Sequence, residues 1–175
     1  MFQLILVVIA IALTAAMVVA SINYIPWWYK SAADTEQSMR SSMSRLEQTY
    51  DVVVRAANGQ APATTSEADV GLMSQFGHAL KFKPAAPAGY TWIYGVQPDD
   101  GTRYANLNYF CLIPTGAGAS EGVYKGIERA RAVYSREQVV LSSQCGHTTD
   151  WAKPASYPAK VYVTMFVQYT PGVTL

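Results

Sequence analysis

Two cysteines, Cys111 and Cys145, are the residues of this 175-residue chain best suited to covalent chemistry, and the sequence holds no other cysteine. An even pair of cysteines in an exported domain most simply forms one disulfide. Such a bond closes a loop of about 35 residues, which stabilises a domain by roughly 3 to 4 kcal/mol in the chain-entropy description. The sequence therefore predicts a disulfide between Cys111 and Cys145.

Two other chemistries could use the same side chains. Cys145 lies close in sequence to His147, and a thiol beside an imidazole base can act as a nucleophile, with His78 as the alternative base. No third group that would orient such a pair can be recognised in the sequence. The two cysteines and two histidines also lack the paired short spacings of a zinc site. We favour the disulfide, and we expect neither a metal nor a cofactor.

Two further patterns resemble catalytic or binding motifs only superficially. Asp99 and Asp100 precede Gly101, a position where aspartate favours a turn, so an acid/base carboxylate pair is the less favoured interpretation. The segment 116–120, GAGAS, leads toward a helix but lacks the Gly, Lys, Ser/Thr order of a phosphate-binding loop. The sequence thus offers no convincing active site, and we predict a protein that is not an enzyme.

Composition narrows the class of partner. The formal net charge is +1 and no basic run occurs. Nucleic-acid binding depends on phosphate neutralisation by Lys and Arg, so we expect no direct contact with nucleic acid. Only 14% of the residues are charged, while tyrosine alone supplies 12. This balance favours adhesion to other proteins, including further copies of the same chain.

The N-terminal stretch is the strongest signal for how the chain is positioned. Residues 2–25 contain no Asp, Glu, Lys, Arg or His. As a helix these residues would be about 36 Å long, enough to cross a hydrocarbon core of roughly 30 Å. The residues that follow suit a membrane interface, where aromatic rings and then a cation meet the lipid headgroups: Trp27, Trp28, Tyr29 and Lys30. We predict a transmembrane anchor over 1–29 and one domain over 30–175.

The apolar stretch has two other interpretations besides a retained anchor. Val18 and Ala20 place small residues just before Ser21, as at the cleavage site of a secretory signal. The apolar stretch is much longer than the usual 7 to 15 residues of such a signal, which favours the anchor. A buried helix of a soluble protein is the other interpretation, and so uniformly apolar a strip is unusual for one.

Two features of the sequence bear on the side of the membrane on which the domain lies, and they point in opposite directions. Lys30, Arg40 and Arg45 follow the apolar stretch and favour a cytoplasmic domain by the positive-inside rule. The cysteine pair favours an oxidising compartment. We expect a single-pass protein of the bacterial inner membrane with its C-terminal domain in the periplasm.

An amphipathic helix is predicted over 31–57. Its apolar residues recur at steps of four and three: Met39, Met43, Leu46, Tyr50, Val53 and Ala57. This stripe either packs on the protein's own sheet, which we favour, or seats a coiled-coil partner.

The rest of the chain predicts a mixed domain. We expect a short helix within 66–80, strands within 90–96 and 102–113 that form a hairpin, a helix over 120–134, and strands over 137–142 and 160–169. The predicted fold class is α+β: an N-terminal transmembrane helix continues into an amphipathic helix that packs on an antiparallel sheet of about four strands, with short inserted helices.

The layout resembles type IV pilins and pseudopilins, in which an uncharged N-terminal helix runs into an amphipathic helix and a small disulfide-bearing α+β domain. Those proteins carry Glu at the fifth position of the mature chain and a cleaved leader before it, whereas this chain has Ile5 and begins Met1, Phe2, Gln3. It is therefore without the carboxylate that those families use to register against a neighbouring subunit.

In length and layout the chain is more similar to the small PilM-type inner-membrane proteins encoded with conjugative thin pili. That resemblance implies a non-catalytic part in the basal body or the pilin-export machinery of a type IV pilus. The implied partners are membrane lipid and other pilus-assembly or pilin subunits. A minor pilin within the filament and a membrane-tethered periplasmic enzyme remain as alternatives.

Overall fold

A computed structural model of the chain describes residues 2–23, 27–63, 68–70, 73, 76, 83–97, 107–150 and 153–167. In chain order the elements are α1 (Phe2–Asn23), α2 (Trp27–Ala56), β1 (Ala68–Asp69), β2 (Tyr90–Val96), β3 (Asn108–Pro114), α4 (Glu121–Arg131), β4 (Val139–Ser142) and β5 (Tyr162–Phe166). The fold is α+β, as predicted, with three helices and an antiparallel five-stranded sheet among these residues.

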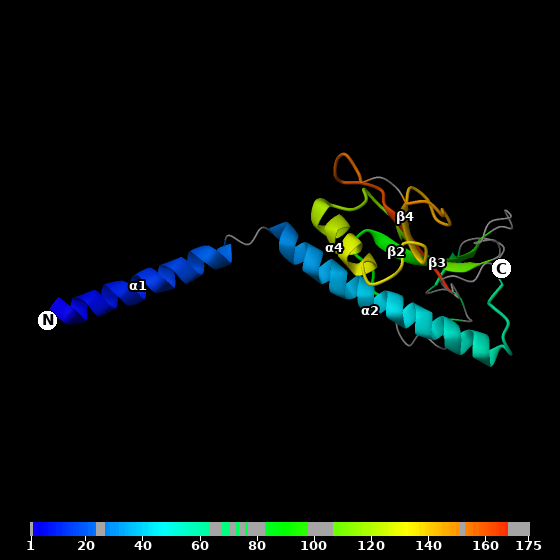
Figure 1. Cartoon of the computed structure of the whole chain (residues 1–175), viewed down its shortest axis with the longest axis horizontal. Coiled ribbons are helices and arrows are strands. Elements are labelled where there is room, and N and C mark those ends of the chain that lie inside the picture. The colour runs from blue at the N-terminus through cyan, green and yellow to red at the C-terminus, as the bar shows by residue number, and fades with distance from the viewer. Residues whose placement is uncertain are drawn as a thin grey trace.

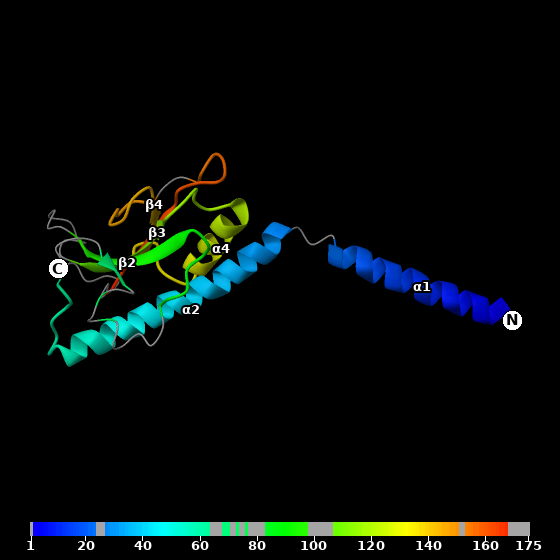
Figure 2. The ribbon, with the colours of Figure 1, turned by 180° about the vertical axis from the view of Figure 1, so that it is seen from behind.

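Helix α1 lies apart from the domain. Figures 1 and 2 show it as a rod that extends away from the start of α2. Its large apolar side chains are about half exposed or more, from Ile9 at 49% to Met17 at 70%. Within the described residues, none of the helices combines the length and the apolar character needed to cross a bilayer. The structure thus does not support the predicted transmembrane anchor over 1–29.

Helix α2 begins earlier than the sequence indicated. The helix expected over 31–57 occurs as Trp27–Ala56, so Ser31 lies in its second turn. At its other end, Asn58 and Gly59 adopt positive φ angles of 55° and 88°, and Gly59 N–H donates to the Val54 carbonyl at 2.8 Å. This left-handed turn satisfies carbonyls of the last helical turn and ends the helix.

The sheet has the strand order β1-β2-β3-β5-β4, and each neighbouring pair is antiparallel. β3 is central, and its Cys111 lies opposite Ile93 on β2 and Thr164 on β5. One strand more than the expected four or so is present. The additional strand is β1, whose two residues are too few to show a periodic pattern in sequence.

Both faces of the sheet are apolar. One face packs on α2 and α4 and forms the main core, in which Trp92, Tyr94, Phe110, Leu112, Val139, Leu141, Val163 and Met165 alternate along four strands. The other face carries a smaller cluster of Ile93, Tyr109, Cys111, Val140 and Phe166. Because successive strand residues point to opposite sides, these two sets interleave along each strand.

Helices α2 and α4 pack closely because α4 presents glycines to α2. A Cβ atom at Gly122 would lie 2.7 Å from the Trp28 carbonyl oxygen, and one at Gly126 would lie 2.6 Å from the Ala32 carbonyl oxygen. The start of α4 is fixed by Ser120, whose Oγ accepts a hydrogen bond from Val123 N–H. This packing fixes the C-terminal end of α4 beside β4.

Candidate functional site

The predicted disulfide pair is present. The Sγ atoms of Cys111 and Cys145 lie 1.99 Å apart and their Cα atoms 5.9 Å apart, so the cysteine pair is at disulfide distance. Cys111 is fully buried on β3, and Cys145 is half-buried in the loop that follows β4. The sequence thus predicted this pairing correctly.

The disulfide fastens a loop to the second face of the sheet. Gly146 N–H donates to Thr164 Oγ1 at 3.1 Å, and Thr164 Oγ1 in turn lies 3.7 Å from Cys111 Sγ. Gly146 has a positive φ of 74°, and a Cβ there would lie 2.5 Å from Gln97 Oε1. The positive φ is the main reason for glycine at this position, and a side chain there would also have to displace the end of the Gln97 side chain.

Neither cysteine is free to act as a nucleophile, because both are joined in the disulfide. His147 contacts Gln144 through its ring nitrogen, within the same loop. His78, Asp99 and Asp100 lie outside the described residues. In the part of the chain that the structure describes, no three His, Cys, Asp or Glu side chains gather as a metal site would require.

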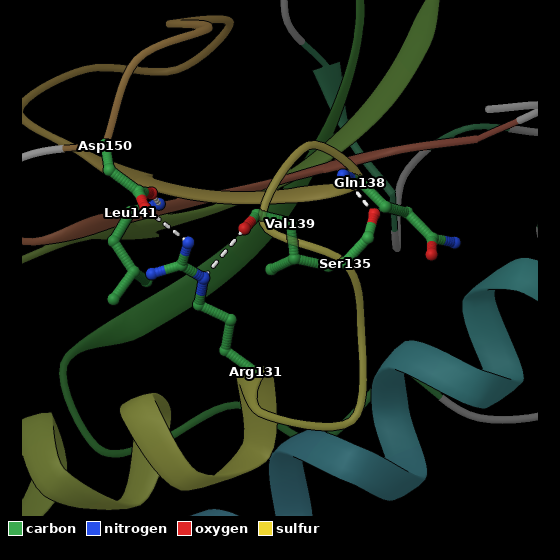
Figure 3. Close-up of polar contacts among 6 residues, drawn as sticks. All are labelled: Arg131, Ser135, Gln138, Val139, Leu141 and Asp150. Carbon is green, nitrogen blue, oxygen red and sulfur yellow. Dashed lines mark hydrogen bonds and ion pairs between the residues drawn. The ribbon is translucent and has the colours of Figure 1, made fainter. Parts of the chain in front are cut away.

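A polar cluster that the sequence did not reveal lies at the outer edge of β4 (Figure 3). Arg131, the last residue of α4, donates from Nε to the Val139 carbonyl at 2.9 Å, and its Nη2 lies 2.5 Å from Asp150 Oδ2. Asp150 Oδ1 accepts from Leu141 N–H at 3.3 Å. One ion pair thus joins the helix end, the strand edge and the disulfide loop. We refer to Arg131 and Asp150 as the edge clip.

The strand register explains why these two backbone groups need partners. Phe166 N–H donates to the Gln138 carbonyl at 2.9 Å, so residues 138, 140 and 142 direct their backbone groups toward β5. Val139 and Leu141 therefore direct theirs outward, because antiparallel pairing alternates along a strand. The Val139 N–H donates to the Ser135 carbonyl at 3.1 Å. Together with the Val139 carbonyl, which Arg131 binds, and the Leu141 N–H, which Asp150 binds, three of the four outward backbone groups of Val139 and Leu141 have a partner within the chain.

The opposite edge of the sheet is also protected. β1 has two residues, and its Asp69 carboxylate accepts from Lys83 Nζ at 3.0 Å and from Thr91 Oγ1 at 3.4 Å. Very short strands and charged side chains are the usual means by which proteins prevent strand addition at an edge. Among the described residues, both edges of the sheet thus carry features that oppose pairing with another strand.

The apolar stripe of α2 packs into the domain's own core, which is the interpretation that we favoured over a coiled-coil partner. Met39, Met43 and Leu46 are completely buried, and Tyr50 is 1% exposed. Val53 is half-buried against the same cluster. These side chains face the protein's own sheet and are not accessible to a coiled-coil partner of the folded domain.

The predicted interface residues form the first turn of α2 and lie against α4. Lys125 Nζ lies 4.0 Å from the centre of the Trp28 ring, and Arg129 Cζ lies 5.2 Å from that of Tyr29. Trp27 is 73% exposed, and Lys30 is exposed on the rim of a shallow hollow. Of these four residues, Trp28 and Tyr29 thus make cation–π contacts with cations of α4, while Trp27 and Lys30 are exposed to solvent.

No signal in the sequence identified the edge clip. Arg131 is separated from Val139 by 8 residues and from Asp150 by 19, and no periodicity links a helix end to a strand edge over such distances.

No protein-family model matches the chain, and neither a curated protein nor a solved structure matches it.

Proposed function

We propose that this protein is a non-catalytic component of a bacterial pilus-assembly apparatus, attached to the inner membrane through α1 and carrying its α+β domain on the periplasmic side. Its place is in the basal body or the pilin-export machinery. Its partners are membrane lipid and other pilus subunits. The resemblance to pilins and to PilM-type proteins of conjugative thin pili motivates the proposal.

The observation that carries the proposal is the apolar surface of α1. Ten large apolar side chains of this helix are 49–70% exposed: Ile5, Leu6, Val7, Val8, Ile9, Ile11, Leu13, Met17, Val18 and Val19. Full burial of one such side chain contributes roughly 1.5 to 3 kcal/mol. Ten of them supply on the order of 10 kcal/mol or more in favour of an apolar environment. A surface this extended supports attachment to lipid or to the helices of other subunits.

The disulfide supports the periplasmic side. Disulfides persist in oxidising compartments, of which the bacterial periplasm is one, and are rare in the reducing cytosol. Cys111 is fully buried, so its bond to Cys145 belongs to the folded domain and not to an unfolded segment. A folded, disulfide-linked domain beside an apolar helix is the arrangement expected of an exported protein that stays attached to the cell envelope.

Attachment through α1 is tested by fractionation of cells that express the full chain. We expect the protein in the membrane fraction after carbonate washing, and Val8→Asp to release a large part of it. Val52→Asp on α2 is the matched control, because Val8 and Val52 are both 57% exposed and the same charge is introduced. Equal retention of the Val8→Asp variant would exclude α1 as the point of attachment.

The compartment is tested by alkylation of cysteines in intact cells. We expect both thiols to be blocked until a reductant is added. Labelling without reductant, and only after the inner membrane is opened, would place the domain in the cytoplasm.

The part in pilus assembly is tested by deleting the gene in its host and scoring piliation and conjugal transfer. We expect loss of both, with rescue by the wild-type gene and with the protein absent from sheared pili. Recovery in sheared pili would identify a minor pilin instead. Normal piliation and transfer in the deletion strain would overturn the proposal.

A further inference from the structure

A hollow lies where the first turns of α2 meet α4 and the loop before β2. Its volume is about 420 Å³, within the roughly 300 to 1,000 Å³ of small-molecule sites. Figure 1 shows this part of α2 at the end of the domain nearest α1. Pro87 and Val123 form an apolar part of its lining. The polar part comes from four residues of α2: Lys30, Ser31, Asp34 and Thr35.

These four polar side chains have no partner within the described part of the chain. Neither Lys30 nor Asp34 forms an ion pair there, and neither the Ser31 nor the Thr35 hydroxyl forms a hydrogen bond. Thr35 is only 7% exposed, and its Cγ2 methyl lies toward Gly126 of α4, so its hydroxyl is left facing the hollow. Buried polar groups are normally hydrogen-bonded, and a polar ligand in the hollow would supply the missing partners.

We propose that the hollow binds the headgroup of a phospholipid that joins a phosphate to a primary ammonium, as phosphatidylethanolamine does. The phosphate lies at Lys30 and the ammonium at Asp34. This inference rests on the proposed function, because it takes α1 to lie in the membrane, and it names the lipid that the domain recognises.

The two unpaired charges match a ligand that carries both signs. Lys30 and Asp34 are four residues apart on α2, so they lie on one face of the helix, about 6 Å apart along its axis. They do not pair with each other, and a cation that precedes its anion at this spacing is the less favourable order. The Ser31 and Thr35 hydroxyls lie beside them and can donate to phosphate oxygens. A ligand with a phosphate alone would meet the Asp34 carboxylate, which repels it.

The nature of the ammonium is also specified. The Asp34 carboxylate accepts hydrogen bonds, and a primary ammonium donates them. A trimethylated ammonium has no N–H to donate. We therefore expect the hollow to prefer phosphatidylethanolamine over phosphatidylcholine.

The position of the hollow favours a lipid as the source of this headgroup. Three residues separate Asn23, the last of α1, from Trp27, the first of α2. A chain of that length spans at most roughly 14 Å. The polar layer on each side of the hydrocarbon core is roughly 5 to 8 Å thick, so a domain held by a membrane-embedded α1 has this hollow at the headgroups. Trp27 lines the hollow, is 73% exposed, and has the amphipathic ring typical of that layer.

The test is a competition between two lipids with identical acyl chains. The full chain is purified in a neutral detergent containing equal amounts of phosphatidylethanolamine and phosphatidylcholine, and the lipids that stay bound are quantified by mass spectrometry. Contacts between α1 and the acyl chains are the same for both lipids, so the ratio reports on the headgroup. We expect phosphatidylethanolamine to be enriched on the order of tenfold, as one charge-assisted hydrogen bond provides. Equal amounts of the two bound lipids would overturn the inference.

Three variants make the result specific to the hollow. Asp34→Asn should abolish the enrichment and should increase the binding of phosphatidylglycerol, which has the phosphate without the ammonium. Lys30→Met should lower the amount of phosphatidylethanolamine bound. Asp51→Asn changes an exposed acid of the same helix outside the hollow and should behave as the wild type. An enrichment that survives Asp34→Asn would assign it to another site and would also overturn the inference.

A soluble competitor distinguishes the lipid from a free metabolite. Glycerophosphoethanolamine has the same headgroup without acyl chains, and at a concentration equal to that of the lipid it should not displace the bound phosphatidylethanolamine. Displacement would make the ligand a soluble compound and would contradict the inference.

Failure of this inference and failure of the proposed function give different results. Membrane retention through α1 together with an equal lipid ratio would leave the proposed attachment and remove the headgroup site. Equal retention of the Val8→Asp variant and the wild type would exclude attachment through α1, whatever the lipid ratio.

Discussion

Asn108 on β3 donates from Nδ2 to the hydroxyl of Tyr50 on α2 at 2.7 Å, across 58 residues of sequence. The other atom of the same amide, Oδ1, lies 2.6 Å from the Tyr94 hydroxyl, which also reaches the Pro62 carbonyl at 2.8 Å. All three side chains are buried. Asn108 is thus the polar link between the long helix and the centre of the sheet.

Replacing Asn108 by Ala should lower the free energy of unfolding by about 2 to 4 kcal/mol, because two buried tyrosine hydroxyls lose a partner at once. Tyr50→Phe removes one hydroxyl together with its bond and should cost only about 1 kcal/mol. Chemical denaturation of the two variants and the wild type measures both losses in the free energy of unfolding. An Asn108→Ala variant as stable as the wild type would show that water replaces the amide.

The same tyrosines make the domain sensitive to alkali. Burial raises the pKa of Tyr50 above its ordinary value, with the hydrogen bond from Asn108 opposing the shift, and burial likewise raises the pKa of Tyr94. In the unfolded chain these hydroxyls ionise near pH 10. Their contribution to the free energy of unfolding is complete below that pH. It is lost as the pH rises toward the higher pKa values of the folded state, because in that range only the unfolded chain releases the protons.

We therefore expect the melting temperature to fall steeply as pH rises above about 10. The Tyr50→Phe variant should show a shallower fall, because one of the titrating groups is gone. Thermal melts across the alkaline range test this. Equal slopes for the wild type and the variant would exclude Tyr50 as a contributor.

Gly126 is the tightest point of contact between α2 and α4. Besides the Ala32 carbonyl oxygen, a Cβ there would lie 2.6 Å from Thr35 Cβ, and neither neighbour is the mobile end of a long side chain. Gly126→Ala should destabilise the domain by about 1 to 3 kcal/mol, as overpacking does. Gly116→Ala is the control, since nothing lies within 4 Å of its Cβ. A neutral Gly126→Ala would mean that the helices can move apart without cost.

Local patterns predicted the elements well where a period was present. The strand expected within 90–96 occurs as Tyr90–Val96, and the helix expected over 120–134 occurs as Glu121–Arg131. The strands at 137–142 and 160–169 are shorter than expected, as Val139–Ser142 and Tyr162–Phe166. Most of the helix expected within 66–80 lies outside the described residues.

The tertiary arrangement was not available from those patterns. β5, the last strand in sequence, lies between β3 and β4, and strand order leaves no local signature. Asn108 and the edge clip have no local signature either, because each joins elements through single side chains far apart in sequence. The disulfide was the exception, since two cysteines allow only one pairing.

A charge introduced into the α2 stripe should be severely destabilising. Met43 is completely buried, and Met43→Glu would place a carboxylate without a partner in the main core. We expect a loss of about 3 kcal/mol or more, because burying an unpaired charge costs at least as much as creating a large cavity. Ser44→Glu changes the next residue, which is exposed on the same helix, and should be nearly neutral. An unchanged melting curve for Met43→Glu would contradict the packing of α2 on the sheet.

Removing the disulfide should release the loop that it fastens to the second face of the sheet. The two cysteines are 34 residues apart, and a bond closing a loop of that size contributes roughly 3 to 4 kcal/mol. Cys111→Ala with Cys145→Ala should lower stability by that order and release the loop that carries Gly146 and Asp150. Because Asp150 belongs to the edge clip, amide exchange at Leu141 should rise together with exchange in the loop. Faster exchange in the loop alone, with Leu141 still protected, would show that the clip holds without the disulfide.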